Sequence, residues 1–297
     1  MKKSLIADGA LLFVAICWGL NFVVEKNVLS TISPIMYLAF RFLLSSLLMA
    51  IVFHKRLKSI NKEDIKAGLV VGTFMMLGFL TQTVGLVYTT PSKSGFITGS
   101  NVVMVPFFAY LLTKRFPGSS QILGAVITFI GLGIISISDN LSIAYGDILT
   151  LLCAISFALQ ITFTEHYVKK ADPINMATIQ VLLTGIVTMA MSLVNEPVNF
   201  DLGLENWAAI LFGAVFCTAG AFAVQNVAQK YTSSTHAAVI LCTESVFAGI
   251  FSFLFWREPL TFKTISGFVL IWIGVMITEL FPSESQQTSA ATRQEAT

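Results

Sequence analysis

One acidic residue, Glu244, interrupts an otherwise apolar run that extends from residue 237 to residue 255. A charge at the centre of a lipid bilayer costs from roughly 3 to over 10 kcal/mol, depending on the reference state. A carboxylate kept at such a place requires a partner, a proton or a water-filled cavity. Its chemistry would then be that of a binder of cations or a carrier of protons.

Polar and aromatic side chains in other apolar runs belong with Glu244. Five of them are amides: Asn21, Gln82, Asn101, Gln160 and Gln225. Trp18 and Phe157 each lie three residues before an amide, Asn21 and Gln160, on the same helical face. We predict that these eight residues contact a substrate, with the two aromatic rings as apolar walls. Ordinary helix packing is the alternative for the rings.

Three interpretations of Glu244 remain open. It faces a watery cavity and binds an ammonium group or a proton; burial makes proton exchange by this carboxyl group possible. It is a structural carboxylate, hydrogen-bonded through Thr243 or Ser245. Or it pairs with Arg41, the other deep charge. Arg41 lies closer to the level of Glu25, so we expect Arg41 and Glu25 to form a structural ion pair.

The composition is that of a membrane protein. Hydrophobic residues make up 55% of the 297 positions and charged residues 11%, whereas a soluble domain needs about 25% charged residues. Apolar runs of about 20 residues are long enough for a helix to cross a bilayer. We predict ten such helices, at about 8–27, 34–53, 66–86, 93–113, 121–138, 147–168, 173–194, 207–228, 236–255 and 264–281.

The basic residues predict the orientation in the membrane. Thirteen of the 18 Lys and Arg residues fall on the side of the two termini, which the positive-inside rule assigns to the cytoplasm. We therefore expect a multi-pass protein of a cell (inner) membrane with both termini cytoplasmic. The first helix resembles a signal peptide but shows no convincing cleavage site, so we expect it to be retained. Residues 282–297 are predicted to be a disordered cytoplasmic tail.

The sequence contains an internal repeat. At an offset of 139, Asp8 aligns with Asp147 and Pro34 with Pro173. After a shift of four residues, Gln82 aligns with Gln225. We predict a five-helix repeat in residues 1–140 and a second one in 141–281. Since five is odd, the second repeat enters the membrane inverted, as in many secondary transporters, whose substrate site lies near the midplane.

Four local motifs, together with the internal repeat, indicate a resemblance to a known family. They are YTTPSKSGFITG at 88–99, ESVFAG at 244–249, REPLT at 257–261 and GFVLIWIGV at 267–275. Their order and the doubled module resemble the drug/metabolite transporter superfamily, in particular EamA-type permeases. The resemblance implies ten helices, cytoplasmic termini, a central cavity formed mainly by helices 1, 3, 4, 6, 8 and 9, and transport of small metabolites, often amino acids outward. The sequence departs from the family at Arg115, the mate of Glu258, where a Glu is common.

Helix 4 carries the features of a gate. Pro106 frees a backbone carbonyl, and Gly95 and Gly99 have the spacing that lets helices approach closely. We predict that these three residues act in gating, with helix packing as the alternative for the glycines.

Other sites are not indicated. The four cysteines lie within predicted spans and are interpreted as packing residues. The three histidines are interpreted as membrane-surface residues. The sequence has no motif for a phosphate loop, a hydrolase nucleophile, a metal or another cofactor.

These observations predict a transporter and not an enzyme. We expect secondary-active or facilitative export or exchange of small polar metabolites by alternating access, because no ATP-binding loop is present. A proton-coupled exporter of drugs or lipophilic cations that uses Glu244 is the alternative. A non-transporting scaffold or an intramembrane enzyme is a remote one. The expected partners are a small-molecule substrate, the bilayer and possible protons, with no nucleic acid, in a monomer or homodimer.

Overall fold

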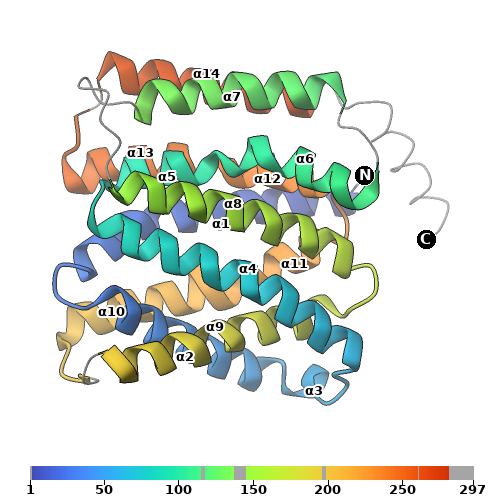
Figure 1. Ribbon diagram of the computed structural model, residues 1–297, viewed down its shortest axis with the longest axis vertical. Helices are drawn as coiled ribbons and strands as arrows, with labels where there is room; N and C mark the ends of the chain where they lie inside the picture. The colour runs from blue at the N-terminus through green and yellow to red at the C-terminus, as the bar shows by residue number, and fades with distance from the viewer. Residues whose placement is uncertain (1, 115–117, 137–144, 196–198, 260, 281–297) are drawn as a thin grey trace.

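The protein is an all-α bundle whose long helices run alongside one another (Figure 1). The computed structural model describes residues 2–114, 118–136, 145–195, 199–259 and 261–280. The predicted tail, Arg115 and the predicted boundary between the repeats at residues 140 and 141 lie outside these ranges. Helix α1 begins and α14 ends at the same end of the molecule (Figure 1).

The first half of the chain forms seven helices. They are α1 (Lys2–Val28), α2 (Pro34–Val52), α3 (His54–Leu57), α4 (Lys62–Val87), α5 (Pro91–Gly99), α6 (Asn101–Thr113) and α7 (Ser119–Ser136). The second half forms α8 (Tyr145–Tyr167), α9 (Pro173–Asn195), α10 (Gly203–Ala214), a π-helix (Val215–Gly220), α11 (Ala221–Ala228), α12 (Ser234–Cys242), α13 (Glu244–Trp256) and α14 (Phe262–Leu280). The π-helix joins α10 and α11 into one segment.

Most of these segments can span a bilayer. In the described residues, eight segments are long and apolar enough to cross a membrane, among them α5–α6, α10–α11 and α12–α13 taken together. The two remaining segments are shorter apolar helices, Ile122–Gly131 within α7 and Phe262–Gly274 within α14. All ten coincide with the predicted runs. The predicted all-α membrane fold is confirmed.

The two halves pack in matching pairs. The last helices, α7 and α14, lie side by side along one edge of the bundle (Figure 1, top). The second helices, α2 and α9, also contact each other. The first helix of each half contacts the interrupted helix pair, α1 against α12–α13 of the other half and α8 against α5–α6. Such exchange between halves is expected of an inverted repeat.

Each half contains one interrupted helix with the same division. Helix α5 has nine residues and α6 has thirteen, separated by Ser100. Helices α12 and α13 have the same lengths, nine and thirteen, and are separated by Thr243. At both places the hydroxyl group donates to the carbonyl three residues back, at 2.7 Å from Ser100 and 2.6 Å from Thr243. The interruption is therefore a property of the repeat.

The ends of these interrupted helices are also alike. Thr90 and Ser233 cap their beginnings, since each side-chain oxygen accepts a backbone N–H three residues on. At their ends, Lys114 and Arg257 both adopt the left-handed conformation, with φ of 57° and 55°. All four positions are related by the offset of 143 that the sequence predicts. Local capping thus fixes the same segment twice.

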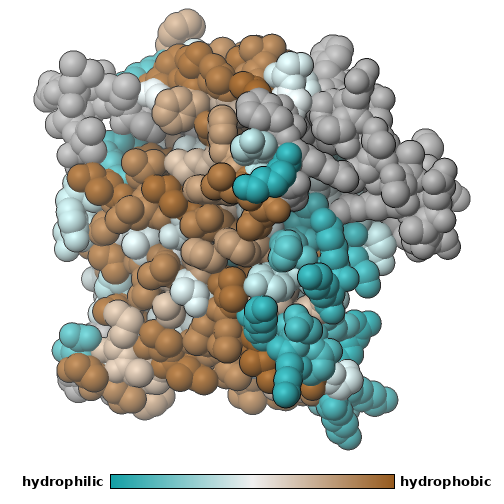
Figure 2. Space-filling view, turned by 45° about the vertical axis from the view of Figure 1, so that its right-hand side comes forward, coloured by the Kyte–Doolittle hydropathy of each residue, from teal (hydrophilic) through white to brown (hydrophobic). Residues whose placement is uncertain are grey.

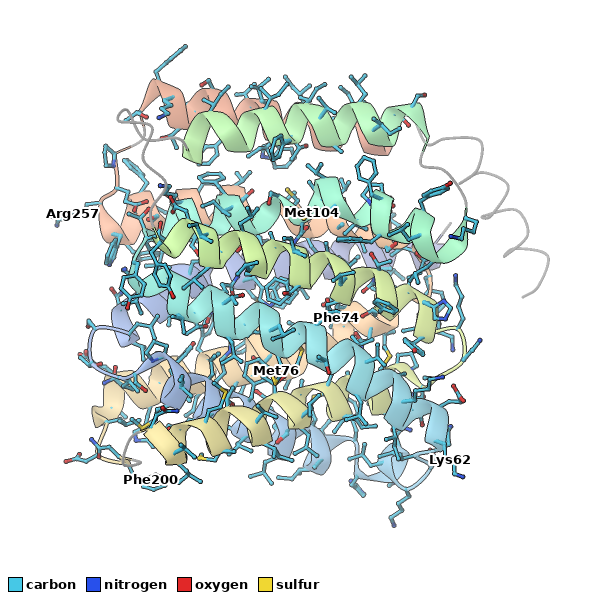
Figure 3. All side chains as sticks on the ribbon, in the orientation of Figure 1. Lys62, Phe74, Met76, Met104, Phe200 and Arg257 are labelled. Carbon is cyan, nitrogen blue, oxygen red and sulfur yellow. The ribbon has the colours of Figure 1, made fainter. Side chains whose placement is uncertain are left out.

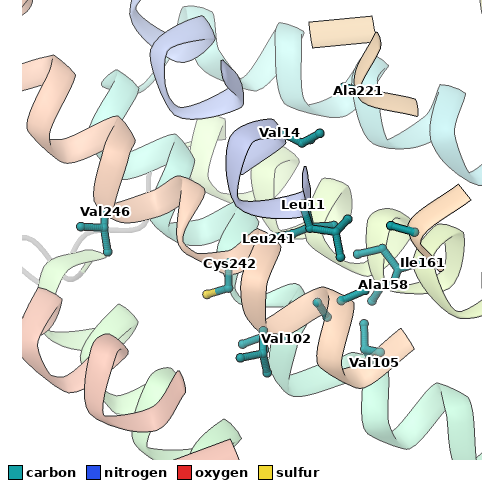
Figure 4. Packing of buried hydrophobic residues seen from close by; sticks show 14 of the residues in the cluster. Leu11, Val14, Val102, Val105, Ala158, Ile161, Ala221, Leu241, Cys242 and Val246 are labelled. Carbon is teal, nitrogen blue, oxygen red and sulfur yellow. The ribbon is translucent and has the colours of Figure 1, made fainter. Parts of the chain in front are cut away.

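Apolar side chains from both halves fill the interior. One cluster contains residues of α1, α6, α8 and α12, among them Leu11, Val102, Ala158 and Leu241 (Figure 4). Hydrophobic side chains also cover most of the face in Figure 2, while hydrophilic ones gather at one end. Lys62 lies at one end of the bundle and Arg257 at the opposite end (Figure 3). This distribution fits a lipid-facing belt between two polar ends.

A glycine in α1 sets the distance to α13. A Cβ atom added at Gly19 would lie 2.5 Å from Phe247 Cβ and 2.9 Å from the Glu244 carbonyl oxygen. We expect Gly19→Ala to lower stability by about 1–3 kcal/mol through overpacking. The measurement is the apparent melting temperature in detergent. Gly9→Ala in the same helix is the control, because nothing lies within 4 Å of its added Cβ. Equal melting temperatures for the two variants would contradict this packing.

Candidate functional site

A central cavity lies where the interrupted helices meet α1, α4, α8 and α11. It encloses about 510 Å³ of space not filled by protein atoms, including the part open to solvent. Fourteen residues line it: Trp18, Asn21, Phe22, Arg41, Phe79, Gln82, Asn101, Phe157, Gln160, Ile161, Phe222, Gln225, Leu241 and Glu244. All eight residues predicted to contact a substrate are in this set. Most of the set therefore comes from the six helices that the family resemblance implied.

The lining is nearly symmetric between the two repeats. Twelve of the fourteen residues form pairs at the offsets of 139 or 143: Trp18/Phe157, Asn21/Gln160, Phe22/Ile161, Phe79/Phe222, Gln82/Gln225 and Asn101/Glu244. Only Arg41 and Leu241 of the lining lack a mate in it. The cavity thus follows from two copies of one helical arrangement meeting about a common centre.

Glu244 is the charge that the two copies do not share. It is the first residue of α13, halfway along the segment Ser234–Trp256, and its residue is 6% exposed. The hydroxyl groups of Thr243 and Ser245 donate to the Ile240 and Cys242 carbonyls instead. In the described part of the chain, no hydrogen bond or ion pair reaches its carboxylate. Of the three interpretations, the geometry favours an acid that faces the cavity.

Asn101, the mate of Glu244, is similarly unpartnered. It begins α6 and is 4% exposed. Its Oδ1 atom is buried and has no hydrogen-bond partner within the described residues. Buried polar atoms in folded proteins are normally hydrogen-bonded. Asn101 and Glu244 thus leave hydrogen-bonding capacity directed at the cavity from both repeats.

The other amides make bonds to protein groups. Gln82 Nε2 donates to Thr98 Oγ1 at 3.2 Å, and Asn21 Nδ2 donates to Glu25 Oε2 at 2.7 Å. Gln225 Nε2 donates to Gln160 Oε1 at 3.2 Å. These bonds orient the four amide side chains. Two of the amide oxygen atoms, Asn21 Oδ1 and Gln225 Oε1, are buried and have no hydrogen-bond partner among the described residues.

Arg41 and Glu25 form a buried ion pair. Arg41 Nη1 lies 3.2 Å from Glu25 Oε2, with side-chain exposures of 0% and 2%. Thr83 Oγ1 and Asn21 Nδ2 also donate to the Glu25 carboxylate, and Arg41 Nε donates to Thr218 Oγ1 at 2.8 Å. Arg41 also lines the cavity. From the sequence, Arg41 is expected to form a structural ion pair and is not predicted to line the cavity.

A π-helix supplies a backbone acceptor that the sequence did not indicate. The Cys217 carbonyl oxygen, within Val215–Gly220, accepts hydrogen bonds from Trp18 Nε1 at 2.8 Å and from Arg41 Nη2 at 3.3 Å. Short π-helical insertions are frequent at functional sites. The carbonyl thus fixes the orientation of one predicted wall residue and one cavity cation together.

Aromatic rings form one side of the cavity. The Phe79 ring lies 5.1 Å from that of Phe157 and 5.8 Å from that of Phe222, in edge-to-face geometry, and Phe222 lies 5.6 Å from Trp18. The Arg41 guanidinium lies 5.0 Å from the Phe79 centroid. Phe79 and Phe222 were not singled out in the sequence, although the offset of 143 relates them. Extending the repeat comparison to aromatic residues would have found them.

The predicted gating residues lie beside the interruption. Gly95 faces Ala248, to which an added Cβ would come within 2.7 Å, and Gly99 faces Cys242 and Ser245. These contacts join α5 to the other repeat. Pro106 lies inside α6, six residues after the interruption at Ser100. Since the same interruption occurs at Thr243 without a proline, the division of the helix does not require Pro106.

The chain matches a protein-family model and resembles a solved structure. The model of the EamA-like transporter family matches the chain twice, over residues 5–137 and 144–280. A solved structure with 13% sequence identity superimposes with a TM-score of 0.73, covering 91% of this chain and 96% of that one. The second comparison concerns the fold alone.

Relatives of similar length occur in several organisms. An uncharacterised transporter of Archaeoglobus fulgidus is 34% identical over 278 residues, covering 94% of this chain and 87% of the relative. The uncharacterised transporter YyaM of Bacillus subtilis is 27% identical, covering 90% and 91%. A chloroplastic WAT1-related protein of Arabidopsis thaliana is 24% identical, covering 88% of this chain and 66% of its own length.

Proposed function

Because the chain belongs to the EamA-like transporter family and is a multi-pass membrane protein, we propose that it exports or exchanges small polar metabolites, such as amino acids, by alternating access. The observation that carries this proposal is Glu244, a carboxylate without a protein partner in the described residues, which lines a central cavity. Such a group binds a substrate ammonium group by a charge-assisted hydrogen bond.

The remaining lining supports a small substrate with both polar and apolar parts. Asn101 and Gln82 offer amide groups in the same cavity as Glu244, and Asn21, Gln160 and Gln225 extend its polar surface. Trp18 and Phe157, with Phe79 and Phe222, provide ring faces that pack against a hydrocarbon portion. Ligand sites combine a mostly apolar wall with few convergent polar groups in this way.

The proposed transport cycle uses the two repeats, residues 1–140 and 141–281, as the parts that move. Inverted repeats rock about a site between them, so that the cavity opens to one side of the membrane at a time. Gly95 and Gly99 would be the points where α5 slides on the other repeat. Pro106 would let α6 bend. No ATP-binding motif is present in the sequence, so the cycle would run on a gradient.

We also propose that the end with exposed Lys55, Arg56, Lys58, Lys62 and Lys66 faces the cytoplasm of a cell whose inner membrane holds the protein. The concentration of hydrophilic side chains at this end supports that orientation (Figure 2). Both termini would then be cytoplasmic.

A proton-coupled exporter of lipophilic cations is a second candidate. The aromatic wall of Trp18, Phe157 and Phe222 favours it, because aromatic faces also bind organic cations. Glu244 would then bind the proton and the cation in turn.

Comparison of metabolites released by cells with and without the protein tests the function. We expect amine-bearing compounds to accumulate outside cells that produce it. Proteoliposomes containing the purified protein should then exchange the same compound. If uptake into inverted vesicles persists after the proton gradient is collapsed, the antiport candidate fails. If no amine-bearing compound moves in either assay, the leading proposal fails.

A further inference from the structure

Two ion pairs join the repeats at opposite ends of the bundle. Asp8 of α1 lies 3.0 Å from His236 of α12, measured from Oδ1 to Nε2. Asp147 of α8 pairs with Lys93 of α5. Helix α1 begins at the end where α12 begins, whereas α8 begins where α5 begins, at the other end (Figure 1). Each pair therefore connects a residue of one repeat with a residue of the other.

The two pairs are copies of one another. Asp8 aligns with Asp147 at the offset of 139, and Lys93 aligns with His236 at the offset of 143. The sequence analysis aligned the aspartates but interpreted His236 as a surface residue. The same contact, between the first helix of one repeat and the interrupted helix of the other, is thus made twice, once on each side of the membrane.

Both pairs lie at equal distances from the cavity. His236 precedes Glu244 by eight residues, and Lys93 precedes Asn101 by eight residues. At 1.5 Å per residue, each pair lies about 12 Å along its helix from Glu244 or Asn101 in the cavity. All four side chains of the two pairs are largely buried. Each pair therefore lies between the cavity and one end of the bundle along these helices.

The pairs differ in strength. Thr89 Oγ1 also donates to Asp147, at 3.2 Å, which adds a bond to this pair. Thr232, the mate of Thr89, makes no such bond to Asp8 in the part of the chain that the structure describes. A lysine is charged throughout the physiological range, whereas an imidazole is charged only when protonated.

We propose that Asp8–His236 and Asp147–Lys93 are the two gates of the transporter, and that the cavity opens more readily past Asp8–His236, the weaker gate. The proposal rests on the alternating access proposed above. Each pair must separate when its side opens, because it joins two repeats that move apart there. Breaking one pair therefore shifts the equilibrium toward the conformation that is open on that side.

A reporter cysteine in the cavity tests this. Leu241→Cys places a thiol in the lining, and its reaction with a charged, membrane-impermeant methanethiosulfonate is measured in right-side-out and inside-out vesicles. The same chain without the reporter corrects for the four native cysteines, which are buried. The variants are Asp8→Asn and Asp147→Asn, and the control is Asp201→Asn, an exposed acid outside both pairs.

We expect the two variants to act in opposite directions. Asp147→Asn should raise the labelling rate from the Lys93 side by about fivefold, which corresponds to about 1 kcal/mol in a two-state equilibrium. Asp8→Asn should raise it from the His236 side and by less, since the unmodified protein already opens there. His236→Lys, which copies the stronger gate, should lower labelling from that side. The exchanged pair Asp147→Lys with Lys93→Asp should lower the labelling rate again, though not fully, since the ion pair returns and the Thr89 bond to Asp147 does not.

The outcomes distinguish a failure of the gate proposal from a failure of the proposed transport function. Labelling that rises on both sides, or on neither, in a protein that still transports would overturn the paired gates and leave the transport function standing. An equal effect of Asp201→Asn would do the same. A reporter that reacts from neither side, in a protein that moves no compound, would contradict both.

Discussion

Glu244→Gln is expected to reduce transport of an amine-bearing substrate by at least about tenfold, since hydrogen bonds to charged groups contribute about 1.5–3 kcal/mol. The amide keeps the shape of the side chain but removes the charge that faces the cavity. It also cannot take up a proton, so the dependence of transport on pH should flatten or invert. Initial rates in proteoliposomes at several pH values measure both effects.

Glu244→Asp is the matched control for this substitution. It keeps the carboxylate and should retain more transport than the glutamine variant. Both variants should be produced at the level of the unmodified protein, because the carboxylate makes no hydrogen bond or ion pair within the described residues. An unchanged flux and pH profile in Glu244→Gln would remove Glu244 from the mechanism.

Arg41→Met is expected to be the most destabilising single change in the cavity. Its removal leaves Glu25 buried, at 2% exposure, without its cation. Breaking one partner of a buried pair costs about 3–5 kcal/mol. The apparent melting temperature in detergent should therefore fall sharply.

The double variant Arg41→Met with Glu25→Gln tests the cause. Removing both charges leaves no uncompensated ion, so most of the lost stability should return. Thr83 and Asn21, which bond to Glu25, can also bond to a glutamine. A double variant no more stable than Arg41→Met would show that packing of the guanidinium against Phe79, and not charge, holds this region.

Much of the architecture was predictable because the bilayer restricts it. Apolar runs of bilayer length fixed the helices, and two copies of one pattern fixed their pairing. The residues predicted to contact a substrate line one cavity because polar side chains in apolar runs have few places to lie. Gln82 and Gln225, far apart in the chain, could be matched because the repeat relates them.

Other features depend on the packing of the whole bundle. The π-helix at Val215–Gly220 lies inside a continuous apolar run, and in such a run the period of apolar residues does not reveal a single π-helical turn. The interruption of the helix at Thr243 could not be predicted from a proline, because no proline lies beside it. Arg41 was assigned to a structural pair because it lies close to the level of Glu25. Its position at offset 139 in the second repeat is Gln180, which does not line the cavity, so the repeat gave no reason to place Arg41 there.

The most direct test asks whether water reaches position 244. In Glu244→Cys, a thiol in a wet cavity can ionise and react with a water-soluble maleimide, whereas a thiol in hydrocarbon stays protonated and inert. Phe253→Cys, on the outer surface of the same helix at 44% exposure, is the control. We predict labelling at position 244 and none at 253. Labelling at 253 alone, or at neither position from either side of the membrane, would contradict a central substrate cavity.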